Sequence, residues 1–281
     1  MNPVEPVDTV ELFLPLSRKL IAVLKALPPD GWARPTICAP WSVKDVAAHL
    51  LGGNLGRLKD RDEKSSPSED PILDYDELVS LINRHNAAWV QAARRISREL
   101  LVEFLDLSDR QVVRYFKSLA PDAPAPITVG WAGSDLPPNW FDIAREYTEK
   151  WLHQQHIREA LGLPVLTERK WLYPVLDTFL RGLPHAYRSV EAENGASITV
   201  QITGPAGGAW TLVREGRFAN RPYWRLYAGD SQAACRVQID QDLAWRLFTK
   251  GVSPEAAKGQ VHIDGNAALG EQVLEMVSIM A

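Results

Sequence analysis

Apolar residues recur at helical spacing through the first 165 residues of the chain. The spacing predicts four helices, over residues 7–27, 42–63, 74–105 and 139–162. Pro15 either kinks the first of these helices or marks its first turn. Ser42 opens the second helix, with Asp45 three residues later as an aspartate version of the capping box. Four helices joined by one long connection are typical of a bundle whose inward side chains can build a site.

The connection at 106–138 differs from the helices around it. It contains two short β-like runs, VVRYF and ITVGWAG, separated by a stretch rich in proline and alanine. We expect a crossover here, with or without a small hairpin. A polar, proline-containing segment at 64–72, KSSPSEDPI, is expected to be a mobile loop.

After residue 196 the pattern changes to alternation of apolar and polar residues. Four such runs predict an antiparallel sheet: SITVQITG, GAWTLVREG, YWRLYAG and AACRVQID. DLAWRLFTKG and ALGEQVLEMVSIMA have the apolar spacing of helices that pack on it. The segment 168–188 carries Pro174 and Pro184, which indicate a kinked or broken helix. We therefore predict an α+β multidomain chain, with a four-helix bundle over 1–165 and a smaller α+β domain over 166–281.

Composition argues against several classes of function. The 281 residues carry a formal net charge of -4 and no basic patch, which argues against nucleic acid or an anionic membrane as the main partner. No apolar run approaches the roughly 20 residues that span a bilayer. The N-terminal segment lacks the apolar core of a secretory signal, so we expect a cytoplasmic protein. In that reducing compartment Cys38 and Cys235 are expected to be free, mainly structural thiols.

The predicted helix at 139–162 carries a polar stripe. Asn139 is its expected N-cap, and Gly162 followed by Pro164 ends it. At about 100° per residue, Glu149, His153 and His156 fall within roughly 60° of one another. Both faces of this helix also carry apolar residues: Leu152 and Ala160 beside the stripe, and Ile143, Tyr147 and Trp151 opposite. A carboxylate and two imidazoles that face a core must be paired, neutralised or bound to a metal.

His49, on the second predicted helix, is the natural partner for this stripe. It shares a face with Gly52, Gly53 and Gly56, so either another helix approaches closely or room is left for a bound group. Asn54 and Arg57 follow on the same helix, and surface positions are expected for both. Two imidazoles and a carboxylate are a recurrent ligand set for Zn²⁺ or a similar ion, although an E-x-x-x-H pair is common in helices.

The motifs themselves resemble a known family. W-S-V-K-D-V-A-A-H-L at 41–50, preceded by T-I-C-A-P, and E-K-W-L-H-Q-Q-H-I-R-E-A-L-G at 149–162 resemble the N-terminal domain of mycothiol-dependent maleylpyruvate isomerases, a DinB-like four-helix bundle. T-G-P-A-G-G-A-W-T-L at 203–212 and V-H-I-D-G-N-A-A-L at 261–269 are similar to the sterol-carrier-like C-terminal domain of the same proteins. The resemblance covers nearly the whole chain.

The resemblance implies a divalent metal, commonly zinc, bound by His49, Glu149 and His153. It also implies a low-molecular-weight thiol such as mycothiol as cofactor. Many relatives carry an aspartate where this chain has His156, which could be a fourth ligand, a partner that orients a ligand, a general base, or a core histidine bonded to a backbone carbonyl.

The family's isomerase also uses an arginine from the C-terminal domain. Arg217, Arg221 and Arg225 are the candidates here to bind a carboxylate substrate, and a solvated strand face is the alternative for each. His85, His185 and His262 have no partner at metal-ligand spacing and are expected to be structural.

These observations predict a divalent-metal-dependent enzyme in which the metal activates a thiol toward a small electrophilic substrate. Isomerisation and S-transfer are the two expected reaction types. The alternative is a non-catalytic protein that binds a metal or an apolar ligand, and a third possibility is a stress-induced bundle protein of another activity. The sequence makes no prediction about the oligomeric state.

Overall fold

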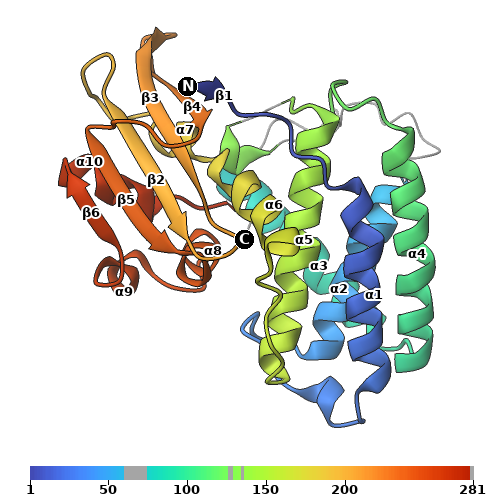
Figure 1. Ribbon diagram of the computed structural model, residues 1–281. Coiled ribbons are helices and arrows are strands. Elements are labelled where there is room, and N and C mark those ends of the chain that lie inside the picture. Colours follow the sequence, from blue (N-terminus) through green and yellow to red (C-terminus); the bar gives the residue numbers. More distant parts are fainter. Residues whose placement is uncertain (60–74, 126–128, 134–135, 279–281) are drawn as a thin grey trace. The chain divides into compact units, whose positions relative to one another are not determined.

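The structure, a computed structural model, describes residues 1–59, 75–125, 129–133 and 136–278 (Figure 1). The loop expected at 64–72 lies outside these residues. The chain divides into two compact units. One comprises Asp8–Ile127 and Leu136–Leu166, and is called the helical unit here. The other comprises Met1–Val7, Thr128–Asp135 and Thr167–Met280, and is called the sheet unit.

The described residues of the helical unit form five helices. They are α1 (Val10–Ala26), α2 (Val43–Lys59), α3 (Tyr75–Ala93), α4 (Arg98–Ser118) and α5 (Asn139–Ala160). Helices α1, α2, α4 and α5 pack alongside one another as a bundle, and α3 packs on α2 (Figure 1). Pro15 lies inside α1.

Aliphatic side chains fill the space between these helices. Val43, Val46 and Ala47 of α2 are fully buried, and so are Leu101 and Leu105 of α4. Burial of this kind is the main favourable term in folding, at about 25 cal/mol per Å² of apolar surface. Polar side chains that enter the same interior must therefore be paired to avoid a large desolvation cost.

The start of α2 confirms the predicted capping box. The Asp45 carboxylate accepts hydrogen bonds from the Ser42 amide at 3.1 Å and the Ser42 hydroxyl at 3.0 Å, and the Asp45 amide donates to Ser42 Oγ at 3.3 Å. Arg94 also donates to both oxygens of Asp45. The first turn of α2 is thus held by side-chain bonds to its free amides.

The prediction of a single helix over 74–105 is wrong, because the helix is interrupted between Ala93 and Arg98. Ser97 is the N-cap of α4, and its side chain accepts a hydrogen bond from the Leu100 amide. The β-like run VVRYF is also wrong: it is the last part of α4. Val112, Val113 and Phe116 continue the buried stripe at helical spacing, so packing outweighs the β preference of these side chains.

The described part of the connection before α5 is mostly irregular. Gly130–Ala132 forms one 3-10 turn where the run ITVGWAG predicted β structure. An isolated bridge joins Pro124 to Pro138. Of the two alternatives left open, the described residues of this segment show the crossover without a hairpin.

Arg57 and Asn54 are buried in the helical unit, so the surface positions expected for them are wrong. Arg57 donates to both oxygens of Asp142 at 2.6 and 2.7 Å and to Glu146 at 2.6 Å. Burial alone would raise the pKa of Asp142, but Arg57 and Arg145 hold it below its usual value. Charged groups inside the bundle therefore compensate one another.

Asn54 belongs to a second buried polar group, one turn away on α2. Its amide donates to Ser108 Oγ and Asp109 Oδ1, both at 2.8 Å. The Lys150 ammonium of α5 donates to Asn54 Oδ1 at 2.5 Å and to Asp109 Oδ1 at 3.1 Å. Polar contacts thus connect α2, α4 and α5.

The sheet unit contains one six-stranded sheet in the order β1-β4-β3-β2-β5-β6. Its strands are β1 (Asn2–Pro3), β2 (Ser197–Thr203), β3 (Gly208–Phe218), β4 (Arg221–Ala228), β5 (Cys235–Asp240) and β6 (His262–Gly265). The four predicted strands are confirmed, and the short edge strands β1 and β6 are additional. All neighbours are antiparallel except β2 and β5, which are parallel.

Short helices accompany this sheet. They are α6 (Arg169–Leu180), α7 (Leu183–Ala186), α8 (Gln241–Phe248), α9 (Pro254–Lys258) and α10 (Ala267–Glu271). The break between α6 and α7 agrees with the predicted broken helix. The final predicted helix is wrong in length, since α10 passes into a 3-10 turn at Gln272–Glu275. The fold class, an α+β chain with a helical bundle and a sheet, is confirmed.

The glycines of α2 differ in what surrounds them, which allows a matched test. A Cβ at Gly52 would lie 2.5 Å from the Trp89 ring, whose indole donates to the Ala48 carbonyl, whereas a Cβ at Gly53 would meet nothing within 4 Å. We expect Gly53→Ala to raise the free energy of unfolding by up to about 1 kcal/mol through helix propensity. Gly52→Ala should lower it, because overpacking costs about 1–3 kcal/mol. Equal stabilisation in urea melts of both variants would contradict this packing.

We expect Arg57→Met to destabilise the protein by about 3–5 kcal/mol, because two buried carboxylates lose their partner. Arg110→Met is the control, since the Arg110–Asp106 pair is exposed and contributes about 0–1 kcal/mol to stability.

The stabilising contribution of Asp142 depends on pH: it is present above the unfolded pKa of this carboxyl and is lost as pH falls through its depressed folded pKa. The difference in free energy of unfolding between wild type and Arg57→Met should therefore become smaller in acid, as measured by thermal melts at a series of pH values.

Candidate metal centre

Helix α5 confirms most of the predicted local structure around the polar stripe. It ends as expected, because Gly162 adopts a left-handed φ of 69° and the Leu163 amide donates to the Arg158 carbonyl at 2.8 Å. Its start differs by one residue, because Pro138 is the N-cap. The side-chain amide of Asn139 instead donates a hydrogen bond to the Ala120 carbonyl. Tyr147 and Trp151 on the opposite face are completely buried.

The structure brings His49, Glu149 and His153 together. Oxygen Oε1 of Glu149 lies 2.9 Å from His49 Nε2 and 3.0 Å from His153 Nε2. The two imidazole rings meet edge to face, with centroids 4.7 Å apart. Both histidine side chains are 12% exposed and that of Glu149 is 34% exposed, so the cluster lies at the edge of the interior. Trp41 covers His49 with a ring separation of 5.1 Å.

Glu149 and His153 control each other's protonation. Burial alone would lower the pKa of His153, but the Glu149 carboxylate, with a contribution from Cys38, raises it to about 10. Burial alone would raise the pKa of Glu149, yet His153 and His49 hold it well below its usual range. In the metal-free protein the cluster is thus a carboxylate shared between imidazoles.

These side chains fit a divalent ion. One donor atom from each of the three residues lies within 4.8 Å of the other two. A tetrahedral ion with bonds of about 2.0–2.1 Å separates its donors by about 3.4 Å, so each histidine nitrogen would need to lie about 0.4–0.5 Å farther from the Glu149 oxygen. Two nitrogens and one oxygen leave a fourth position open, as catalytic zinc sites do.

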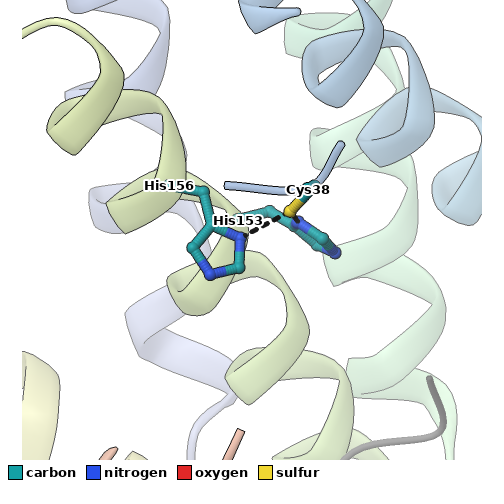
Figure 2. A group of neighbouring side chains, drawn as sticks. All are labelled: Cys38, His153 and His156. Atoms are coloured by element: carbon teal, nitrogen blue, oxygen red, sulfur yellow. Dashed lines mark hydrogen bonds between the residues drawn. The ribbon is translucent and has the colours of Figure 1, made fainter. Parts of the chain in front are cut away.

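A second group of donors adjoins the first and was not recognised in the sequence. Figure 2 shows Cys38 next to His153 and His156. The Cys38 sulfur lies 3.0 Å from His156 Nδ1 and 3.9 Å from His153 Nδ1. Cys38 is 115 residues from His153, so no spacing rule links them. The one available signal was its position in T-I-C-A-P, immediately before the motif that carries His49.

The arginines proposed from the sequence belong to the sheet unit. Arg217 and Arg225 have side chains 52% and 48% exposed, and each has an acidic neighbour: Glu191 for Arg217 and Glu215 for Arg225. Arg221 is also exposed. Arg214 was not considered, although it is 3% exposed and its Nε and Nη1 have no hydrogen-bond partner among the described residues. A role for Arg225 in binding substrate stays a prediction.

Comparison with known proteins places the chain in a family. Residues 13–158 match the model of the mycothiol maleylpyruvate isomerase N-terminal domain. The chain belongs to this family. The matched range contains Cys38, His49, Glu149, His153 and His156.

Two solved structures are similar to the chain: the crystal structure of the mycothiol-dependent maleylpyruvate isomerase and that of a mutant of it. Each is 12% identical, with a TM-score of 0.48 over 85% of this chain and 88% of that chain. No curated protein matches the chain at a significant level. Among the described helices, none has the length and apolar character that a bilayer span requires.

The raised pKa of His153 gives a pH dependence for the metal-free protein. Its stabilising contribution is fully present below about pH 6.5, the unfolded value, and is lost as pH rises through about 10. We expect NMR of the chelator-treated protein to show the His153 ring protonated at pH 7.5, and Glu149→Gln to move its titration to lower pH. Glu103→Gln, at an exposed position of α4, should leave it in place. A His153 midpoint near 6.5 in the wild type would contradict the pairing.

Proposed function

We propose that this protein is a divalent-metal-dependent enzyme that uses a low-molecular-weight thiol, as an isomerase or S-transferase of the maleylpyruvate isomerase type. The observation that carries the proposal is the convergence of His49, Glu149 and His153 from two helices onto one point. Membership of the mycothiol maleylpyruvate isomerase N-terminal family supports it. Zinc suits this ligand set best and mycothiol is the first thiol to test.

In this proposal the chain positions the reacting groups. His49, Glu149 and His153 would hold the ion, which when bound favours the thiolate form of a coordinated thiol and so supplies a nucleophile at neutral pH. In the metal-free protein Glu149 accepts hydrogen bonds from both imidazoles, and these Nε2 and carboxylate atoms would turn to the ion when it binds. Trp41 packs against the His49 ring, with centroids 5.1 Å apart.

The substrate would be a small molecule with an electrophilic carbon. Attack by the thiolate leads either to S-transfer, when a leaving group departs, or to isomerisation, when the thiol adds to a double bond and is then eliminated. A reducing location such as the cytoplasm suits the proposal, because it keeps both the cofactor thiol and Cys38 reduced.

The ligand assignment is tested by metal binding. We expect the wild type to contain about one divalent ion per chain by elemental analysis. Mn²⁺ takes nitrogen and oxygen ligands, so its binding, followed by electron spin resonance, reports this ligand set directly. His49→Ala and His153→Ala should each weaken Mn²⁺ binding by at least about 100-fold, since even outer partners of a ligand contribute 10–100-fold. His85→Ala, exposed on α3, is the control. Unchanged affinity in both ligand variants would refute the assignment.

The enzymatic part is tested separately. Metal-loaded protein is incubated with mycothiol, glutathione or cysteine and a chromogenic electrophile, and product formation is followed. We expect turnover with at least one thiol and its loss in His49→Ala. Stoichiometric metal without turnover of any thiol would instead favour a non-catalytic metal-binding protein.

A further inference from the structure

We propose that Cys38, His153 and His156 form a second cation site, suited to a borderline or soft divalent ion such as Zn²⁺, Co²⁺ or Cd²⁺. The site uses one sulfur and two imidazole nitrogens. It shares His153 with the His49–Glu149–His153 cluster but does not depend on the function proposed above.

The distances between the donors fit such an ion. For bonds of about 2.3 Å to sulfur and 2.0–2.1 Å to nitrogen, tetrahedral geometry separates a sulfur and a nitrogen by about 3.6 Å. The Cys38 sulfur lies 3.0 Å from His156 Nδ1 and 3.9 Å from His153 Nδ1, one value on each side of this separation. All three donor atoms lie within 4.8 Å of one another. Small side-chain rotations therefore complete the site.

The site is held by rigid local structure. His153 and His156 are three residues apart on α5, so they project from the same face, and their rings lie 5.3 Å apart. Cys38 lies in a loop that is closed by hydrogen bonds between Thr36 and Trp41. The Cys38 amide also donates to Thr36 Oγ1, and the Trp41 amide donates to the Cys38 carbonyl at 2.8 Å. These bonds fix the backbone that carries the sulfur.

The shared histidine makes the two sites alternatives. His153 presents Nε2 to Glu149 and Nδ1 to Cys38. A neutral imidazole has a free lone pair on only one nitrogen, so the ring serves one ion at a time. A thiolate selects softer ions, whereas the carboxylate of Glu149 suits harder ones. An ion on Cys38 would therefore withdraw His153 from the first cluster.

The experiment is a titration of the metal-free, reduced protein with Co²⁺, because a thiolate ligand to Co²⁺ gives a near-ultraviolet charge-transfer band. We expect this band in the wild type, its loss in Cys38→Ser, and at least about tenfold weaker binding in His156→Gln. Cys235→Ser, which removes the other thiol, should retain the band, and so should His49→Ala, which disrupts only the first cluster. Absence of the band from the wild type, its persistence in Cys38→Ser, or its loss in His49→Ala would overturn the proposal.

A measurement on the unmodified protein guards against variants that fail to fold. Cd²⁺ should slow alkylation of Cys38 by iodoacetamide, followed by peptide mass spectrometry, and should also displace Mn²⁺ from the first cluster. Unchanged alkylation of Cys38 would overturn the site, and independent binding of the two ions would overturn the sharing of His153. Failure of the proposed function is distinguishable, because it appears as Mn²⁺ binding that is insensitive to His49→Ala or as absence of thiol turnover.

Discussion

The buried polar pairing of α2 with α5 determines the geometry of the helical unit. Arg57 bonds Asp142 and Glu146, Asn54 bonds Lys150, and His49 bonds Glu149. Arg57 contacts α5 at Asp142 and Glu146, whereas His49, earlier on α2, contacts it at Glu149, so the helices are antiparallel and these pairs set their register. A shift of α2 by one turn along α5 would leave several buried charges without partners, and each would destabilise the fold by about 3–5 kcal/mol. Aliphatic packing alone would tolerate such a shift far more easily.

The same pairing gives the candidate metal cluster of His49, Glu149 and His153 its position. Glu149 is placed between two imidazoles from different helices because the register brings His49 opposite α5 at that turn. Gly52 supports this arrangement by admitting Trp89 close to the α2 backbone, while Gly53 and Gly56 leave open space. Close approach of another helix therefore explains Gly52, whereas Gly53 and Gly56 lie at exposed positions.

Cys38 changes the chemical character of this region. A cluster of two imidazoles and a carboxylate is a site for a zinc-like ion, whereas a neighbouring sulfur adds donors for softer ions. His153 stands between the two sets and has one nitrogen for each. His156 presents Nδ1 to the Cys38 sulfur at 3.0 Å.

The sequence by itself determined the features that depend on neighbouring residues. Helical spacing placed Glu149, His153 and His156 on one face of α5, Ser42 and Asp45 marked the start of α2, and alternation located four strands. Features that depend on distant contacts were decided only by the tertiary structure. Val112 and Val113 became helical because α4 packs on α1 and α2, and Arg57 became buried because α5 supplies two carboxylates. Cys38 lies next to His156 because the loop before α2 lies against α5. Local periodicity carries no information about such contacts: Arg57 and Asp142 are separated by 85 positions, and Cys38 and His156 by 118.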